Sequence, residues 1–259
     1  LKHKGLFKAV IVNSGNANCF TGSLGVKDAL RVTEELGSEL EIKRQGILVA
    51  STGIIGRRLP VAKISKAMPG LVRGLSCKGI DKAKFAIMTT DTFAKEITAE
   101  FNIGKDSIRL SGVAKGAGMI APDMATMLCF IFTDANISQT ALNKALRISV
   151  DNSFNCITVD GCMSTNDSVI LLANGAAKNT LIKGGRGFNL FLTALNLVCL
   201  ELAKMIVKDA EGATKFIRIK VRNAGSFKEA KKIALAIANS NLFKTAVYGQ
   251  NPNFGRIVA

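Results

Sequence analysis

The chain has 259 residues, of which 48% are hydrophobic, so it can bury a sizeable core and is predicted to be globular rather than disordered. Its formal net charge is +16, but the basic residues are scattered along the chain, and with no tryptophan and one tyrosine no basic segment is interleaved with aromatic residues for base stacking. The composition therefore disfavours a nucleic-acid-binding protein and favours a solvated basic surface.

Histidine and cysteine usage restricts the chemistry further. His3 is the only histidine, which argues against a histidine-based catalytic triad and a histidine-rich metal site. The six cysteines form no Cys-x-x-Cys pair, as expected in a reducing compartment. The longest apolar runs are broken by polar residues, so no membrane-spanning segment is predicted.

The first half of the chain is predicted to alternate strands and helices. The expected order is a strand over 6–12, a polar turn over 13–18, a helix over 26–40, a strand over 46–51, a helix over 60–72 and a strand over 85–92. Three of these segments end in hydroxyl or amide side chains, and loops at strand ends are common places for functional sites.

The second half begins with a predicted hairpin over 97–110 around Gly104. The elements expected after it are a strand from Met127, a helix over 139–149 capped by Ser138, short strands over 157–159 and 169–172, a helix over 188–207, a strand over 216–221 and a helix to 238 capped by Ser226. No repeat and no low-complexity linker marks a domain boundary.

A glycine-rich stretch precedes the strand that begins at Met127. Gly112, Gly116 and Gly118 allow the backbone to bend, and Pro122 disfavours a continuous helix. Thr126 is therefore expected where a flexible loop enters a buried strand. By position alone this threonine is as well explained as an ordinary β-former.

Hydroxyl residues beside glycines recur near the ends of predicted strands, at Ser14-Gly15, Thr21-Gly22 and Thr52-Gly53. Backbone N–H groups around such a turn can stabilise a developing oxyanion, and the hydroxyl adds a further donor. Each pair taken singly is also compatible with an ordinary turn. The sequence contains neither a phosphate-binding P-loop nor a Gly-x-Gly-x-x-Gly motif after a strand.

Six segments, in the same order along the chain, resemble the ornithine acetyltransferase family, also called the bifunctional glutamate N-acetyltransferases of arginine biosynthesis. The segments that carry the resemblance are 12–22, 51–56, 88–92, 115–128, 209–215 and 251–256. They extend from Val12 to Arg256, so the resemblance covers almost the whole chain. One departure is Phe254, where the family more often has tryptophan.

The resemblance implies an enzyme that cuts its own Ala125-Thr126 bond. Residues 1–125 would form the alpha chain and residues 126–259 the beta chain, together one catalytic unit. The freed Thr126 would be the nucleophile, which suits a chain without a catalytic histidine. An N-terminal threonine carries its own base, because its α-amino group has an unperturbed pKa of about 7.7–8.0.

The same resemblance assigns the other site residues. Thr52 and Gly53 would form the oxyanion hole, and substrate would contact the side chains of Thr92, Lys115, Thr126 and Glu211. Lys115 could pair with a substrate carboxylate and Glu211 with an ammonium group, which suits an amino-acid-like ligand. Without the resemblance, a surface lysine and a glutamate at a helix end would be the simpler interpretation.

The implied reaction is transfer of an acetyl group from N-acetylornithine to glutamate through a threonine acyl-enzyme, without a metal or an organic cofactor. Use of acetyl-CoA as a second acetyl donor stays open. The implied assembly is a heterotetramer of two alpha and two beta chains with no nucleic-acid or membrane partner. The implied location is cytoplasmic, or mitochondrial in a eukaryote.

The implied fold is α+β, a four-layer α/β/β/α sandwich with a smaller α+β part. Family chains extend further at both ends, so we expect a fragment that lacks both termini, including two further substrate contacts. The alternatives are a self-processing aminopeptidase of related fold and a basic non-enzymatic binding protein. The first would use the same nucleophile on peptides, and the second would explain the charge but none of the motifs.

Overall fold

The structure is a computed structural model that describes residues 5–121, 127–162 and 164–259. The described strands are β1 (Ala9–Asn13), β2 (Ile47–Ser51), β3 (Lys95–Ile103), β4 (Asp106–Lys115), β5 (Leu128–Thr133) and β6 (Ser168–Ala173). The described α-helices are α1 (Gly22–Glu39), α2 (Val61–Arg73), α3 (Ile80–Ala86), α4 (Gln139–Asp151), α5 (Gly185–Lys208), α6 (Phe227–Asn239), α7 (Asn241–Tyr248) and α8 (Gly255–Val258). The class is α+β, as predicted.

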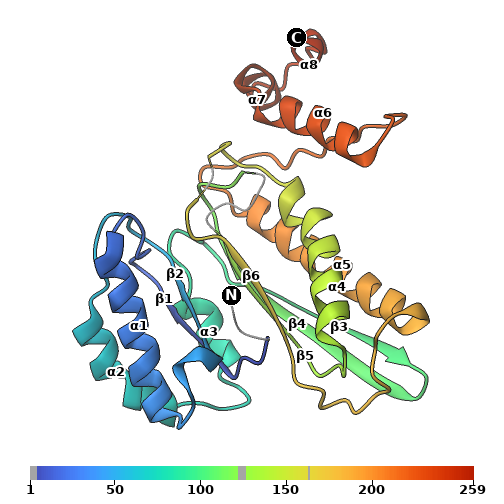
Figure 1. Ribbon diagram of the computed structural model, residues 1–259. Coiled ribbons are helices and arrows are strands. Elements are labelled where there is room, and N and C mark those ends of the chain that lie inside the picture. The colour runs from blue at the N-terminus through green and yellow to red at the C-terminus, as the bar shows by residue number, and fades with distance from the viewer. Residues whose placement is uncertain (1–4, 122–126, 163) are drawn as a thin grey trace.

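The strands form two sheets (Figure 1). β1 and β2 pair in parallel, with Val12 opposite Ala50. The larger sheet has the order β3-β4-β5-β6, in which β4 is antiparallel to both β3 and β5, and β6 runs parallel to β5. The predicted hairpin is confirmed, because Ile103 of β3 lies opposite Asp106 of β4 across a turn that contains Gly104 at φ +63°.

The buried side chains divide the molecule into four layers. One apolar cluster joins α1 and α2 to β1 and β2, and a second joins α4 and α5 to the larger sheet. A third cluster lies between the two sheets and contains Ala50, Val113, Leu128 and Phe130. Helices thus cover the outer face of each sheet, as Figure 1 shows, and the α/β/β/α arrangement is confirmed.

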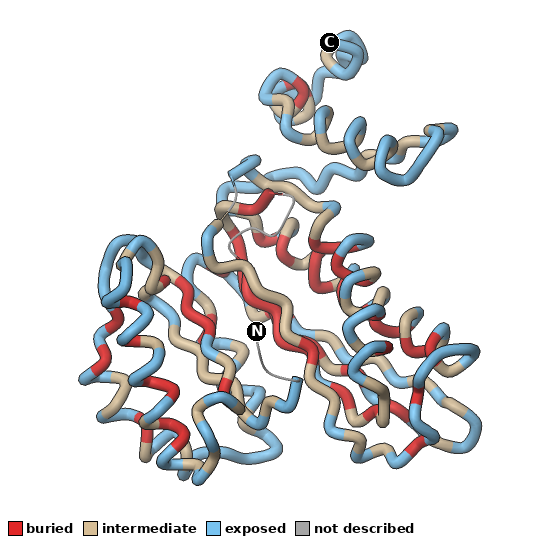
Figure 2. Tube along the Cα trace, viewed as in Figure 1, coloured by how far each residue is buried: buried red, intermediate tan, exposed pale blue. Residues whose placement is uncertain are grey.

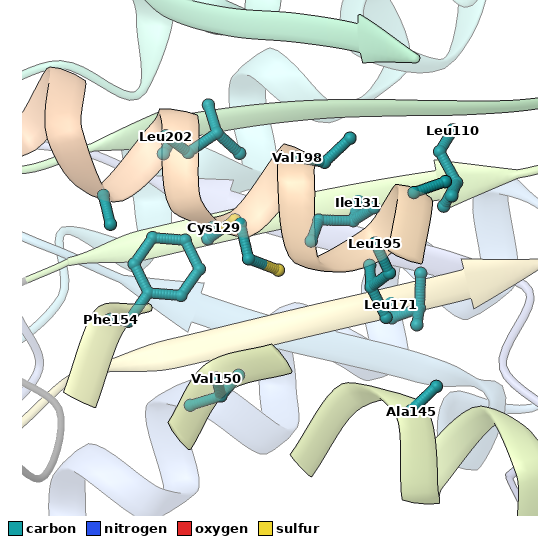
Figure 3. Close-up of a cluster of buried hydrophobic side chains, with 14 of the residues drawn as sticks. Leu110, Cys129, Ile131, Ala145, Val150, Phe154, Leu171, Leu195, Val198 and Leu202 are labelled. Atoms are coloured by element: carbon teal, nitrogen blue, oxygen red, sulfur yellow. The ribbon is translucent and has the colours of Figure 1, made fainter. Parts of the chain in front are cut away.

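The position of strand β5 between two apolar clusters explains why its sequence is apolar at nearly every position. Successive side chains of a strand point to opposite faces of the sheet. Leu128 and Phe130 belong to the cluster between the sheets, whereas Cys129 and Ile131 belong to the cluster under α5 (Figure 3). A strand buried on both faces has no solvent side on which polar residues would be favoured.

Helix α5 packs closely on the larger sheet. Its Leu195, Val198 and Leu202 are fully buried and lie over β4 and β5 (Figure 3). Gly112, predicted as part of the glycine-rich loop, is instead inside β4, where an added Cβ would come within 2.8 Å of Leu202 Cδ1. By length and composition alone α5 could cross a membrane, but its buried face is that of a core helix.

The prediction of a strand over 85–92 is wrong. Helix α3 occupies Ile80–Ala86, and a turn follows in which the Asp91 carboxylate accepts the Thr89 N–H at 3.1 Å. The threonines around Asp91 have high β propensity, but this turn and the buried partners of Asp91 determine the local conformation.

Two further predicted strands are absent from the described part of the chain. In segment 157–159, the N–H of Val159 donates to the Ile120 carbonyl at 2.7 Å, in a loop contact rather than a sheet. Segment 216–221 alternates apolar and basic residues, but no described strand pairs with it. Phe216 and Ile217 accordingly stay 42% and 36% exposed. A period-2 pattern identifies a strand only where a partner strand is present.

The helices after α5 form a small part beside the sandwich (Figures 1 and 2). Ser226 accepts the Glu229 N–H and caps α6, and Ser138 accepts the Ala141 N–H and caps α4, so both predicted caps are confirmed. Lys244 of α7 donates to the Val159 carbonyl at 2.7 Å, which links this part to the sandwich.

Candidate active site

The predicted oxyanion-hole residues lie directly after β2. The Thr52 N–H donates to the Asn13 carbonyl at the end of β1, and Thr52 is only 2% exposed. Gly53 has φ +127°, and a Cβ at this position would lie 2.4 Å from the carbonyl carbon of Gly15. Only glycine fits here, because both the backbone angle and the neighbouring main chain exclude a side chain.

Lys115 reaches Thr52 from the other sheet. It is the last residue of β4 and is 1% exposed. Its Nζ donates to Thr89 Oγ1 at 2.7 Å and to Thr52 Oγ1 at 3.3 Å. Because the lysine donates to the oxygen of Thr52, the Thr52 hydroxyl hydrogen is available for a ligand. The structure therefore brings two predicted site residues together at the join between the sheets.

The electrostatics of Lys115 reflect its burial. Loss of water contact lowers the pKa of the Lys115 ammonium, and the nearby Asp91 carboxylate opposes this effect. Burial alone would raise the pKa of Asp91, but the hydrogen bond from Lys95, the Gly116 N–H and the charge of Lys115 lower it overall. The Asp91 carboxylate therefore stays ionised, and its Oδ2 lies 3.6 Å from Lys115 Nζ.

Asp209, the residue that follows α5, is bonded to Thr92 and lies two residues before Glu211. The backbone N–H and the hydroxyl of Thr92 both donate to the Asp209 carboxylate. Two residues later, the Glu211 N–H donates to the Ala117 carbonyl at 2.9 Å, and Glu211 Oε1 lies 2.8 Å from where a Cβ on Gly118 would stand. Glu211 also lines a cleft of about 300 Å³ beside α7.

Two threonines that are close in the sequence, Thr89 and Thr92, have different partners. Thr89 contacts Lys115, whereas Thr92 is bonded to Asp209. Thr89 lies three residues before Thr92 in the sequence. Its position against Lys115 makes it a further candidate for ligand contact that spacing alone could not select.

Sequence reasoning missed the polar segment before β6. Asp160 accepts the Met119 and Ile120 N–H groups, and Asn166 donates to the Ala17 and Ser51 carbonyls. These contacts join the glycine-rich stretch and the loops after β1 and β2 to one segment. Its acidic and amide residues, placed just before a strand, are the signal that could have identified it.

Asp167 belongs to the same segment, and its carboxyl group has an unusually high pKa. Its Oδ1 accepts the Met127 N–H at 2.6 Å, and among the described residues its buried Oδ2 has no hydrogen-bond partner. Burial raises the pKa of Asp167 to about 7, although the Met127 N–H and the charge of Lys115 act in the opposite direction. Asp167 therefore exchanges a proton near neutral pH, directly beside the residue that follows Thr126.

Replacing Asp167 by asparagine should remove a pH-dependent loss of stability. The folded protein holds the Asp167 proton up to about pH 7, whereas the unfolded chain releases it near pH 4. Stability of the wild type should fall as pH rises through this window. Urea unfolding from pH 4 to 8 should show the Asp167→Asn variant gaining roughly 2–4 kcal/mol relative to wild type, then a plateau above pH 7.

Asparagine keeps an oxygen that can accept the Met127 N–H, so the comparison isolates the ionisation. Asp151→Asn, at the exposed end of α4, is the matched control. A stability difference between Asp167→Asn and wild type that is constant from pH 4 to 8 would contradict the assignment.

The predicted nucleophile Thr126 and its neighbour Ala125 lie outside the described residues, so their cleavage and catalytic roles stay predictions. Within the described ranges, no group of three or more histidine, cysteine, aspartate or glutamate side chains is arranged to hold a metal ion.

The chain matches the family model described as the ArgJ family over residues 1–259, and it belongs to this family. It is 47% identical over 257 residues to the arginine biosynthesis bifunctional protein ArgJ of Caldanaerobacter subterraneus subsp. tengcongensis, covering 99% of this chain and 64% of that protein. It is 49% identical to the mitochondrial ArgJ protein of Candida tropicalis, covering 96% of this chain and 63% of that protein.

A solved structure gives a third comparison. The crystal structure of ArgJ from Bacillus halodurans is 45% identical, with a TM-score of 0.49 over 50% of this chain and 61% of that chain.

Proposed function

We propose that this chain belongs to a self-cleaving acetyltransferase that moves an acetyl group from N-acetylornithine to glutamate in arginine biosynthesis. The observation that carries the proposal is the meeting of Thr52 and Lys115 across the two sheets, at 3.3 Å between Oγ1 and Nζ. An oxyanion donor and a carboxylate-binding cation are thus adjacent in one buried site. Membership of the ArgJ family agrees with this arrangement.

The proposed reaction has two halves that use the same groups. Thr126 Oγ attacks the acetyl carbonyl of N-acetylornithine, and the Thr126 α-amino group takes the Oγ proton. The oxyanion that forms accepts hydrogen bonds from the Thr52 hydroxyl and the Gly53 N–H. The C–N bond then breaks, ornithine leaves with the proton, and the acetyl group stays on Thr126 as an ester.

In the second half, the amine of glutamate attacks this ester through the same oxyanion site. The amine gives up a proton as the new C–N bond forms, and Thr126 Oγ recovers a proton as the ester bond breaks. Because one nucleophile serves both steps, the kinetics should be ping-pong, with no third substrate needed to complete the cycle.

The charges of the site suit substrates of this class. Lys115 would pair with the α-carboxylate of either amino acid, while Glu211 would pair with the side-chain ammonium of ornithine. Three properties complete the proposal: the reaction needs no metal or organic cofactor, the processed chains assemble as a heterotetramer, and the protein is cytoplasmic or mitochondrial. Two relatives carry the word mitochondrial in their names, which supports the latter location for eukaryotes.

Transfer of a labelled acetyl group tests the proposal directly. The protein expressed from its own gene should move [14C]acetyl from N-acetylornithine to glutamate, and a parallel assay with [14C]acetyl-CoA decides whether it has a second donor. No labelled acetylglutamate from either donor would refute the proposed function. Release of amino acids from peptides in that case would favour the self-processing aminopeptidase instead.

A further inference from the structure

Three charged side chains form a buried cluster behind the proposed site. Lys95, at the start of β3, is fully buried, and its Nζ lies 2.7 Å from Asp91 Oδ1 and 2.5 Å from Asp209 Oδ2. The side chains of the two aspartates are 0% and 1% exposed. Buried ion pairs lose most of their attraction to the cost of removing charges from water, so stability alone is a weak reason for this cluster.

Both aspartates have a second set of partners in the proposed site. Asp91 Oδ1 also accepts the Gly116 N–H at 2.6 Å, directly after Lys115, and Asp91 Oδ2 faces the Lys115 ammonium at 3.6 Å. Asp209 accepts the backbone N–H and the hydroxyl of Thr92. Every proposed substrate-binding residue that the structure describes is therefore bonded to the cluster or lies within two residues of it.

Among the described residues Lys115 makes two hydrogen bonds, which leaves one N–H donor for a ligand. An ammonium group has three N–H donors, and two of them are directed at Thr89 and Thr52. Asp91 attracts this ammonium from 3.6 Å, beyond ordinary hydrogen-bond length. Its Oδ1 is bonded to Lys95 and Gly116, and its Oδ2, the oxygen that faces Lys115, accepts the Thr89 N–H. Lys95 thus helps to hold the Asp91 carboxylate in an orientation in which it does not form a close pair with Lys115.

We propose that the Asp91–Lys95–Asp209 cluster positions the substrate-binding groups, holding Lys115 free for a substrate carboxylate and fixing Thr92 and the segment that carries Glu211. This inference rests on the proposed function for the nature of the substrate. None of the three residues touches the ligand, so they are positioning residues. The charges of Asp91, Lys95, Asp209 and Lys115 sum to zero.

Substitution of Lys95 by methionine removes the ammonium group that is bonded to Asp91 Oδ1. Asp91 should then draw Lys115 into a close pair, and the KM for N-acetylornithine should rise about 10- to 100-fold, as expected when a hydrogen bond to a charged group is lost. The kcat should fall less than about threefold, because the oxyanion donors stay in place. Lys95→Arg should recover part of the KM, since it restores a cation between the aspartates.

The matched control is Lys204→Met, which breaks a partly exposed ion pair with Glu201 on α5. Its kinetic constants should equal those of the wild type. If Lys95→Met lowered kcat with KM unchanged, as a smaller fraction of folded enzyme would, the positioning role would be refuted.

A second measurement does not depend on acetyl transfer. NMR of protein labelled with 13Cε-lysine, with the Lys115 signal assigned from Lys115→Arg, gives the pKa of Lys115 directly. The charges acting on Lys115 come from Lys95, Asp91 and Asp167, so its pKa should rise in Lys95→Met and fall in Asp91→Asn. An unchanged Lys115 pKa in both variants would overturn the cluster's role. These shifts in a protein without transferase activity would instead contradict only the proposed function.

Discussion

Replacing Thr126 by alanine should leave the chain uncut and reduce acetyl transfer by at least about 10³-fold. Alanine has no hydroxyl to attack the preceding carbonyl, so the Ala125-Thr126 bond should persist and no N-terminal nucleophile should form. Denaturing electrophoresis and mass spectrometry should show two fragments for the wild type, divided between Ala125 and Thr126, and one intact chain for the variant.

Two further variants make this result specific. Thr126→Ser keeps a hydroxyl and should still be cut, whereas Thr140→Ala, on the exposed side of α4, should behave as the wild type. A wild-type protein that stays whole while transferring acetyl groups would show that Thr126 is not freed as an N-terminal nucleophile.

Replacing Thr52 by valine should lower kcat about 10²- to 10³-fold, the usual effect of removing one oxyanion donor. The KM for N-acetylornithine should change little, because an oxyanion donor interacts with charge that develops only in the transition state. Valine has nearly the shape of threonine, so the buried position after β2 should tolerate it. Steady-state kinetics of the processed enzyme measure both constants.

Thr52→Ser restores the hydroxyl and should recover most of the kcat. Thr33 offers a buried comparison within α1, since it is 6% exposed and its hydroxyl donates to the Leu30 carbonyl. Thr33→Val should leave kcat unchanged for the folded enzyme. An equal loss in the Thr52 and Thr33 variants, or an increase in KM alone for Thr52→Val, would argue against an oxyanion role.

Local chemistry made much of the fold predictable. The capped starts of α4 and α6, the hairpin at Gly104 and the apolar periodicity of α1 and α5 depend on residues close in the sequence. The errors over 85–92 and 216–221 have a different origin. In both segments β-forming residues were correctly recognised, but no described strand pairs with 216–221. In 85–92 the Asp91 carboxylate accepts the Thr89 N–H, and the distant Asp209 carboxylate accepts the Thr92 N–H.

The candidate site, like the fold, was predictable only in part from the sequence. The motifs located Thr52, Gly53 and Lys115, and the structure places Thr52 and Lys115 within hydrogen-bond distance. The motifs could not separate Thr89, which contacts Lys115, from Thr92, which is bonded to Asp209. They also did not identify Asp167, whose raised pKa comes from burial rather than from its sequence neighbours.

The sequence by itself determined the family, the ordered motifs, most helices and the absence of a plausible catalytic histidine, because these properties depend on residue identity and on short-range spacing. Only the tertiary structure decided that Lys95 lies between Asp91 and Asp209, the latter 114 residues away in the chain. Such a pairing depends on how the sheets and α5 pack together. Burial then determines its importance, because charges removed from water respond strongly to every neighbouring charge.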